Sequence, residues 1–486
     1  MRSKLNIRIL LNIVGGLLML EGAFLLIPLI TCIVYKESDW LVFLCVMVLT
    51  ALVGLALRKI PTTSTRMGKR EGFLLTASVW VFFTIFGMLP FIFCSTPVGL
   101  SSAFFEAMSG FTTTGATTLK FPISDLSHGM IIWMALMQWI GGMGIIIFTL
   151  AVVPALNTSG GMLMFNAEAT GITHDKIRPR ISQTAMTLWG TYFLLTVILV
   201  GLLWLGPMDF FDSLCHAFGT ISTGGFSSRT GSVSEYGSDY VLIVVCVFML
   251  LSGMNYAMLY QMAIGRWRAF SHNDVVRVYF GIIVVFSTLF ALGHFLDGNV
   301  ESVEEVTLYP VFQVVSSLTS TGYLAPGFFM WEPFVLALTF IMMFSGGCAG
   351  STSGGAKIDR LIYLKRFLSN ELTHCVHSNA ILSVKMNGKI VNRDLVTKTI
   401  AFLSLFVLLI LGGGVVMSFM GLKPVDSFFS AFSCICNTGF GASLTGYGED
   451  FATIPDAAKW VLSFLMLTGR LEIYTVIILF SRPFWK

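Results

Sequence analysis

Long apolar runs constrain this chain more than any other feature of its sequence. Several of them reach about 18 residues or more, the length that an α-helix needs to cross a hydrocarbon core of about 30 Å. The composition agrees, because 55% of the residues are apolar and only 12% are charged, whereas a typical globular domain carries about 25% charged residues. An ordinary soluble fold is excluded, and the sequence predicts an all-α integral membrane protein.

The apolar runs and the breaks between them predict ten membrane-spanning helices. The first run is too long for the core of a signal peptide, and a second run follows it without a small-residue cleavage site, so both are retained as helices. The eighth predicted helix is interrupted internally. The predicted bounds are 8–34, 40–58, 72–95, 128–155, 183–206, 240–264, 276–296, 333–365, 395–420 and 457–480.

The distribution of basic residues predicts the orientation of these helices. Most of the 30 Lys and Arg residues fall in loops on one side, and cytoplasmic loops carry such an excess in membrane proteins. Both termini are therefore expected in the cytoplasm. The exceptions are Lys36, Lys120, Arg229, Lys423 and Lys459 on the outer side and Arg470 within the membrane.

Four shorter apolar stretches lie on the outer side, at 100–112, 210–221, 307–319 and 426–437. They are too short to span the membrane and are typical of re-entrant half-helices. Each runs straight into a Thr-Gly pair and is followed by a full helix, so one unit occurs four times. The sequence predicts four pseudo-repeated units around one central pore, preceded by two extra N-terminal helices. The predicted divisions are 1–70 for those two helices and 71–158, 159–270, 271–394 and 395–486 for the four repeats.

The Thr-Gly loops hold the candidate ion-binding residues. Non-helical backbone at membrane depth is tolerated only where it is buried or lines a water-filled cavity. Rings of backbone carbonyls in such a place can replace the hydration shell of a monovalent cation. Glycine suits these loops because it adopts backbone conformations that a Cβ blocks. Aligned on their glycines, the residues of the predicted filter are Thr113, Thr114 and Gly115; Ser222, Thr223 and Gly224; Ser320, Thr321 and Gly322; and Asn437, Thr438 and Gly439.

The alignment of these loops rests on more than a dipeptide. A single Thr-Gly pair is common and would mean nothing, but four copies that each end an outer half-helix are not expected by chance. The inward-pointing C-terminal ends of the half-helices carry partial negative charge, which also favours a cation. A large apolar residue stands ten positions before each aligned glycine, at Phe105, Leu214, Phe312 and Phe429.

A glycine-rich segment interrupts the eighth predicted helix. It cannot continue a stable helix, because each glycine costs about 1 kcal/mol relative to alanine. We expect a hydrated loop beneath the filter that blocks the pore when closed and withdraws on activation; the alternative is a bend that allows close helix packing. The candidate gating residues are Gly346, Gly347, Cys348, Ala349, Gly350, Ser351, Thr352, Ser353, Gly354 and Gly355.

Arg470 is the other candidate gating residue. It is the only arginine within the predicted helices' membrane core, and charge at that depth defaults to a functional hypothesis. We expect its guanidinium below the filter, as an electrostatic barrier against leak and against divalent cations. The alternative is a structural ion pair with Glu472 or with an acid such as Glu106, although residues two apart on a helix face different directions.

Four local stretches identify the chain as a member of the Trk/Ktr/HKT superfamily of cation transporters. Residues 109–116 (SGFTTTGA) resemble the family's first filter, and residues 138–145 (QWIGGMGI) resemble the helix after it. Residues 346–357 (GGCAGSTSGGAK) are similar to its intramembrane loop, and residues 469–473 (GRLEI) to its last helix. The two extra N-terminal helices favour the Trk type over the shorter Ktr type. The segment 252–255 departs from the family pattern.

The resemblance implies a substrate, an assembly and a location. Because all four aligned glycines are present, it implies K⁺ as the transported ion. It also implies a homodimer with one pore in each subunit, in the inner (cytoplasmic) membrane of the cell. A cytosolic nucleotide-binding ring, responsive to NAD or ATP, would gate the pore. The basic cytoplasmic loops suit docking of an acidic partner surface.

Functions of other classes find little support in the sequence. We find no nucleophile–base motif at membrane depth, no P-loop and no dinucleotide fingerprint, so this chain is not expected to be an enzyme or to bind a nucleotide. Nucleic acid is not an expected partner. The serious alternative is symport of K⁺ with H⁺ or Na⁺. The lack of an Asp/Glu/His relay in the predicted helices favours channel-like passage.

Overall fold

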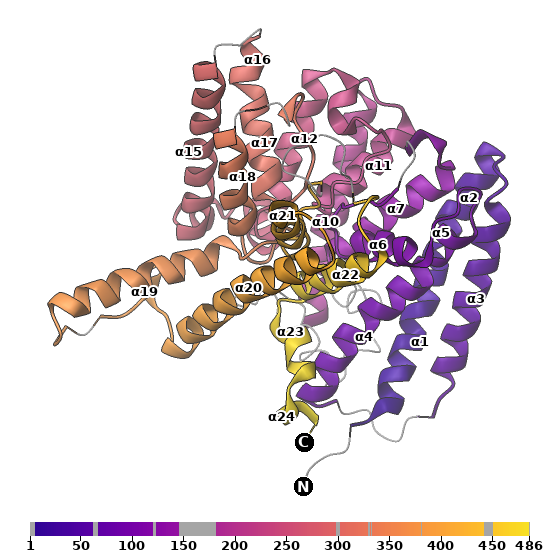
Figure 1. Ribbon diagram of the computed structural model, residues 1–486, viewed down its shortest axis with the longest axis horizontal. Helices are drawn as coiled ribbons and strands as arrows, with labels where there is room; N and C mark the ends of the chain where they lie inside the picture. Colours follow the sequence, from indigo (N-terminus) through magenta and orange to yellow (C-terminus); the bar gives the residue numbers. More distant parts are fainter. Residues whose placement is uncertain are drawn as a thin grey trace.

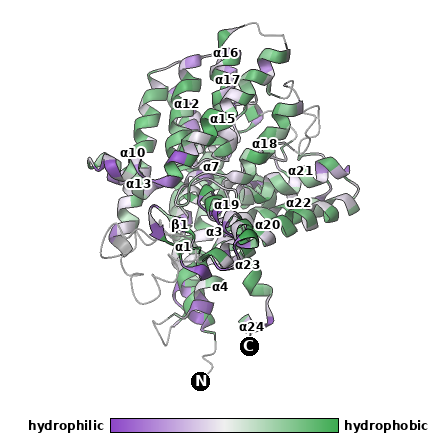
Figure 2. Ribbon diagram, turned by 90° about the vertical axis from the view of Figure 1, so that its left-hand side faces the viewer, coloured by the Kyte–Doolittle hydropathy of each residue, from purple (hydrophilic) through white to green (hydrophobic). Residues whose placement is uncertain are grey.

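The computed structural model describes residues 5–61, 67–119, 123–144, 181–297, 302–328, 331, 333–380, 382–441 and 451–485. Within these ranges the chain is helical except for loops and one antiparallel hairpin of β1 (Lys385–Met386) and β2 (Lys389–Ile390), in which Lys385 pairs with Ile390. Hydrophobic residues dominate the helical ribbon (Figure 2). The predicted all-α class of membrane protein agrees with this architecture.

The N-terminal helices form a tight antiparallel pair. They are α1 (Ile7–Phe24), continued by α2 (Leu26–Tyr35), and α3 (Trp40–Arg58). A Cβ on Gly15 would lie 2.6 Å from the carbonyl oxygen of Gly54, so small residues set this close approach. The pair packs on the remainder of the bundle through α1 against α4 and α2 against α7.

Four stretches of the chain then follow the same order of a long helix, a half-helix, a loop and a second helix. The first has α4 (Lys69–Gly87) with α5 (Leu89–Phe93), α6 (Leu100–Phe111) and α7 (His128–Gly142). The second has α10 (Ile181–Trp204), α11 (Phe210–Ile221) and α12 (Asp239–Ser252) with α13 (Tyr256–Ala263). The third has α15 (Asp274–Asp297), α17 (Leu308–Leu318) and α18 (Pro333–Ser345). The fourth has α20 (Arg393–Phe419), α21 (Pro424–Ile435) and α22 (Asp456–Arg470) with α23 (Tyr474–Ile477).

The half-helices and second helices of these stretches pack in a closed order. α7 packs on α11, α12 on α17, and α22 on α6 (Figure 1). α18 meets α21 through aromatic contacts of Phe340 with Phe429 and Phe432, with ring centroids 5.1 and 5.4 Å apart. Each second helix therefore lies between the half-helix of its own stretch and that of the next.

The spans differ from the ten predicted helices in their continuity. Among the described residues, six helices are long and apolar enough to cross a membrane, or up to eight if two bent pairs are counted. The predictions of continuous spans at 240–264 and 457–480 are wrong, because α12 and α13 meet at 105° and α22 meets its continuation at 114°. The predicted interruption of 333–365 is confirmed by the gap between α18 and α19 (Ile358–Val376). Residues 145–155 of the predicted span 128–155 lie outside the described residues.

The bends have a steric cause that composition does not reveal. A Cβ on Gly469 would overlap the carbonyl oxygen of Ile435, at the end of α21. A Cβ on Gly253 would lie 2.5 Å from the Thr319 methyl group, at the cap of α17. The second helices thus turn where they meet the ends of half-helices, while the sequence stays apolar on both sides of the turn.

Peripheral elements complete the molecule. α19 and the start of α20 project from its side (Figure 1). The short helices are α14 (Trp267–Ser271), α16 (Val303–Val306) and α24 (Arg482–Trp485). The Arg70 guanidinium at the start of α4 lies 5.6 Å from the centre of the Phe484 ring in α24. The C-terminal helix therefore lies at the same end of the molecule as the start of α4.

Candidate ion-conducting site

The four half-helices end in the same backbone conformation. Their cap residues are Thr112, Ser222, Thr319 and Cys436. The next residue in each loop is left-handed, with φ of 52° to 54°, although none is glycine; these residues are Thr113, Thr223, Ser320 and Asn437. The amide after that donates to the carbonyl five positions back, at 2.8 to 3.1 Å in all four loops. This pairing is the Schellman motif, which satisfies the last carbonyls of a helix.

A left-handed glycine stands two positions after the left-handed residue in every loop. These glycines are Gly115, Gly225, Gly322 and Gly439, with φ of 78°, 78°, 85° and 72°. In three loops this glycine is the predicted one. Their common conformation supports the predicted correspondence of the loops.

The second loop is shifted by one residue from the sequence alignment. The alignment assigned Ser222, Thr223 and Gly224, but Ser222 is the helix cap and Gly225 takes the left-handed glycine position. The prediction that Gly224 is equivalent to Gly115 is wrong. Thr223 is followed by two glycines, and the Thr-Gly dipeptide alone does not show which of them carries the turn. The helix cap would have given the correct register.

The glycines connect the four loops into a closed ring. A Cβ on any of them would overlap the carbonyl oxygen of the residue that precedes the next loop's glycine. The pairs are Gly115 with Gly224, Gly225 with Thr321, Gly322 with Thr438 and Gly439 with Thr114. Only glycine permits this approach, and the fourth pair returns to the first loop. The chain therefore brings eleven of the twelve predicted residues into one ring, in which Gly225 takes part and the predicted Ser222 does not.

Buried side chains brace the ring. The Thr112 and Thr114 hydroxyls lie 2.8 Å apart, as do those of Thr319 and Thr321. Asn437 Nδ2 donates to Thr114 Oγ1 at 3.0 Å and so ties the fourth loop to the first. All five residues are buried. The C-terminal ends of the half-helices, with their partial negative charge, lie directly behind these loops.

The intramembrane loop contains all ten predicted gating residues from 346 to 355. It lies against the ends of three half-helices rather than continuing α18. Gly346, Gly350 and Gly355 are left-handed, which explains why the helix stops here. The contacts run from Thr352 Oγ1 to Ile221 O at 3.3 Å, from Gly354 N to Ser320 Oγ at 2.5 Å and from Gly355 N to Cys436 O at 3.1 Å.

Arg470 connects this loop to the first stretch of the chain. Its guanidinium donates to the carbonyl oxygen of Thr352 at 2.7 Å and to those of Gly141 and Gly142 at 2.6 Å each. The two acids weighed as alternative partners make other contacts: Glu472 pairs with Arg360, and Glu106 accepts from Thr118. Arg470 therefore holds backbone carbonyls around the loop.

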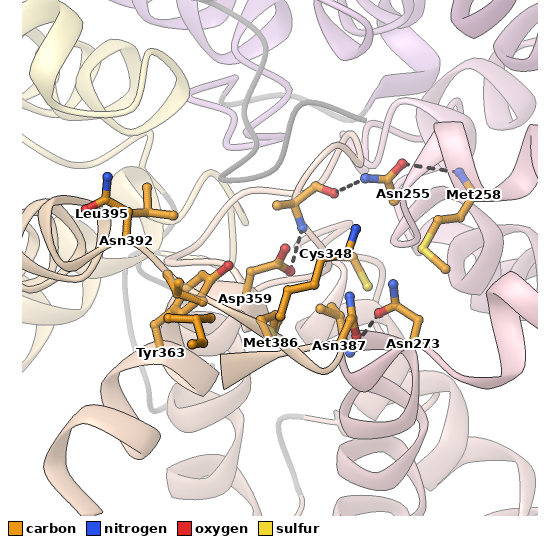
Figure 3. Close-up of a pocket in the computed structure, with 15 residues that line it drawn as sticks. Asn255, Met258, Asn273, Cys348, Asp359, Tyr363, Met386, Asn387, Asn392 and Leu395 are labelled. Atoms are coloured by element: carbon orange, nitrogen blue, oxygen red, sulfur yellow. Dashed lines mark hydrogen bonds between the residues drawn. The ribbon is translucent and has the colours of Figure 1, made fainter. Parts of the chain in front are cut away.

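A polar cavity borders the loop on the side of α13, α19, the β-hairpin and α20. Its volume is about 310 Å³, and its lining includes Asn255, Cys348, Ala349, Asp359 and Asn387 (Figure 3). Asn255 Nδ2 donates to the carbonyl of Ala349 at 2.7 Å, and the Ala349 amide donates to Asp359 at 3.2 Å. Two side chains from other elements thus fix the backbone of the loop at Ala349.

Several buried acids were overlooked in the sequence interpretation, and Glu21 is the one deepest in an apolar helix. Glu21 lies inside α1 with no exposed surface, and none of the described residues donates a hydrogen bond to either carboxylate oxygen. A Cβ on Gly87, the last residue of α4, would lie 3.4 Å from its Oε1. A single acid barely changes the mean hydropathy of a long apolar run. The only sign of a buried carboxylate in the sequence was therefore that Glu21 falls inside the predicted span 8–34.

A second charged group braces the outer end of α11. Asp212 accepts from Arg229 Nη2 at 2.8 Å, from Tyr236 at 2.6 Å and from Ser228 at 2.6 Å. The hydrogen bond to Asp212 raises the pKa of the Arg229 guanidinium above its ordinary value. This outer loop is therefore held to the half-helix that it follows.

Known proteins resemble this chain over its whole length. It is 34% identical to the Trk system potassium uptake protein TrkH of Escherichia coli, over 99% of this chain and 100% of that protein. It is 30% identical to the TrkG protein of the same organism, over 99% of each chain. The crystal structure of the potassium transporter TrkH from Vibrio parahaemolyticus matches with a TM-score of 0.89 at 28% identity, over 99% of this chain and 100% of that one.

These relatives are transport proteins and not enzymes, which agrees with the prediction for this chain. The multiple apolar helices and the transporter relatives together indicate a multi-pass membrane protein. Residues 41–485 match the family model for TrkH, described as a cation transport protein. The chain therefore belongs to the TrkH family of cation transport proteins.

Proposed function

We propose that this chain is the pore-forming subunit of a potassium uptake system, in which K⁺ passes through the ring of four loops. The observation that carries the proposal is the closed ring itself. Four loops with one backbone conformation place a carbonyl oxygen of each against the glycine of its neighbour. A ring of carbonyls at membrane depth suits a dehydrated monovalent cation, and the relatives are named potassium uptake proteins.

The filter residues in this proposal follow the structural register. The second loop contributes Thr223, Gly224 and Gly225, and the other three loops contribute the residues that the sequence predicted. Ser222 is left out, because it caps α11 and pairs with the carbonyl of Gly219. No nucleotide enters the proposed mechanism through this chain.

The proposed gate is the intramembrane loop together with Arg470. The loop bonds to the ends of three half-helices, so its movement would change the space beneath the ring. Arg470 supplies positive charge in the same place and holds the Thr352 carbonyl. A cytosolic nucleotide-binding partner would control this movement by docking on the basic cytoplasmic loops. In this proposal the chain forms a homodimer in the inner membrane, and both of its termini are cytoplasmic.

The experiment is ion flux into liposomes that contain the purified protein. Rb⁺ or K⁺ flux is compared with Na⁺ flux for the wild type, Gly115→Ser and Gly225→Ser. The expected result is selective K⁺ flux that loses selectivity in both variants, because each serine would overlap a neighbouring carbonyl oxygen. Selective flux that both variants retain would show that the ring is not the filter.

A second candidate function is symport of K⁺ with H⁺. The observation that favours it is Glu21, a buried carboxylate for which the described residues offer no hydrogen-bond donor, since intramembrane acids often belong to proton relays. K⁺ uptake driven by an imposed pH gradient in the wild type, and its loss in Glu21→Gln, would support symport. Uptake that follows the K⁺ gradient alone in both proteins would exclude it.

A further inference from the structure

The second loop of the ring lacks a side chain that the other three loops carry. At the position just before the left-handed glycine, the other loops have Thr114, Thr321 and Thr438, whereas the second loop has Gly224. Two of these threonines pair with a hydroxyl at the cap of their own half-helix. The corresponding cap, Ser222, also has a hydroxyl, but Gly224 offers it no partner.

Gln138 of α7 occupies the place of the missing side chain. Its Nε2, Oε1 and Cδ atoms would lie 2.5 to 2.8 Å from a Cβ built on Gly224, and they are the three nearest atoms to it. Gly224 does not have a left-handed φ, so its backbone conformation does not require glycine. The glycine at 224 is therefore explained by the glutamine side chain from the neighbouring stretch.

Both ends of the Gln138 amide bind the second loop. Nε2 donates to the carbonyl oxygen of Gly224 at 2.7 Å, and Oε1 accepts from the amide of Phe226 at 3.1 Å. This orientation is fixed by chemistry, because only the NH₂ group can donate to a carbonyl. Gln138 is fully buried, and it clamps the loop on both sides of Gly225.

We infer that Gln138 determines ion selectivity by holding and polarising one carbonyl of the filter, an inference that rests on the proposed function. The Gly224 carbonyl is the one that faces Gly115 in the ring. A donor on one of its lone pairs fixes its direction and leaves the other lone pair for the ion. Discrimination between K⁺ and Na⁺ depends on the number and field strength of such carbonyls. One quarter of the ring is thus tuned by a side chain that has no counterpart at the other three loops among the described residues.

The test begins with Gln138→Met, which keeps the volume of the side chain and removes both hydrogen bonds. The ratio of K⁺ to Na⁺ flux in liposomes is expected to fall about tenfold, the factor that corresponds to one buried hydrogen bond. Gln313→Met is the matched comparison. Gln313 is equally buried, and its Oε1 accepts from the Ala325 amide at 2.9 Å, but no described contact joins it to a ring carbonyl. Its substitution is expected to change the ratio less than that of Gln138.

A double variant at positions 138 and 224 separates polarisation of the carbonyl of residue 224 from simple packing of the loop. Gly224→Thr alone should collide with Gln138 and reduce selectivity. Combined with Gln138→Ala, the introduced hydroxyl can reach Ser222 as in the first and third loops. No donor to the carbonyl of residue 224 is restored, so selectivity should stay below that of the wild type, and full recovery would overturn the inference in favour of packing. Thermal unfolding of each protein is measured alongside, because a structural role alone would lower stability and both ion fluxes without changing their ratio.

Gly225→Ser, measured in parallel, distinguishes failure of the proposed filter from failure of the inference about Gln138. If Gly225→Ser loses selectivity while Gln138→Met retains the wild-type ratio, the inference about Gln138 is overturned and the filter stands. If neither variant changes the ratio, the proposed filter itself fails. An equal loss in Gln138→Met and Gln313→Met would also overturn the inference, since it would indicate general loosening of the loops.

Discussion

Four residues of the ring hold a left-handed backbone conformation, which suits three of them poorly. The region costs Thr113, Thr223 and Ser320 about 1–2 kcal/mol each, whereas asparagine, as at Asn437, adopts it more readily. The Schellman hydrogen bonds and complete burial offset that cost at every one of them. Strain held in place by its surroundings is common where a protein must keep a fixed geometry for a ligand.

The register of the second loop gives the first prediction. Gly225→Ala should lower the temperature of unfolding and the K⁺ to Na⁺ flux ratio, because alanine there costs about 1–2 kcal/mol in backbone conformation and overlaps the Thr321 carbonyl. Gly224→Ala should do less damage, since it meets only the Gln138 side chain. Thermal unfolding in detergent and liposome flux measure both effects. Greater damage from Gly224→Ala would restore the register predicted from the sequence.

Arg470 gives the second prediction. Arg470→Ala should raise basal K⁺ leak in the absence of any partner, because it removes three hydrogen bonds to carbonyls around the intramembrane loop. Arg470→Lys should recover only part of the effect, since an ammonium lacks the planar fork of a guanidinium. Arg482→Ala, which removes a cation in α24, serves as the control. Leak equal to wild type in Arg470→Ala would remove this residue from the gate.

At the scale of elements, the second helices of three stretches break below the ring. α12 and α22 bend sharply, and α18 gives way to the intramembrane loop. The loop then fills the space that the breaks leave, through bonds to Ile221 and to Ser252 from the hydroxyl of Thr352. In the proposed gate, the strength of these few bonds would set how readily the loop leaves its place.

Thr352 therefore gives the third prediction. Thr352→Val should raise basal flux about tenfold, because it removes the hydroxyl that bonds two carbonyls outside the loop, with a net effect of about 1–1.5 kcal/mol. Ser351→Ala is a matched control, since among the described residues the Ser351 hydroxyl bonds to Cys348 and Ser353, both within the loop. Unaltered flux in Thr352→Val, or an equal rise in Ser351→Ala, would contradict a gating role for these contacts.

The elements show how far sequence reasoning extends. The half-helix expected at 210–221 has the same bounds as α11, and the one expected at 100–112 is one residue longer than α6. These predictions succeed because about a dozen apolar residues between turns are too short to span a membrane and fit a half-helix. The bend after α12 was not predicted, since apolar residues continue on both sides of Gly253. Gln138 was quoted only as part of a family-like stretch, because its partner at Gly224 lies 86 residues away.

At the scale of the whole molecule, both ends of the chain are expected on one side of the membrane, and the outer loops on the other. The charge distribution and the contact of α4 with α24 support this arrangement. The loop after α11 is fixed by Asp212 and Arg229, and the β-hairpin lies near the opposite ends of the helices, beside α19 and α20.

This arrangement gives the fourth prediction. The exposed native Cys45 and Cys375 are first replaced. In cells whose outer envelope is permeable but whose inner membrane is intact, an impermeant thiol reagent should then label Glu235→Cys from the outside. Lys389→Cys should be labelled only after the membrane is opened. Both positions are exposed. The reverse pattern of labelling would invert the proposed topology, and labelling of both from outside would show that one of the two loops is misplaced.

The closed ring of glycine-to-carbonyl contacts is made by one polypeptide, and this has a genetic consequence. In an assembly of four identical subunits, every mutation appears in all four quadrants at once. Here a single codon alters one quadrant and leaves three intact, as the pairing of Gln138 with Gly224 illustrates. With the ring as the proposed filter, ion preference would therefore change in small heritable steps, each acting on one quarter of the ring.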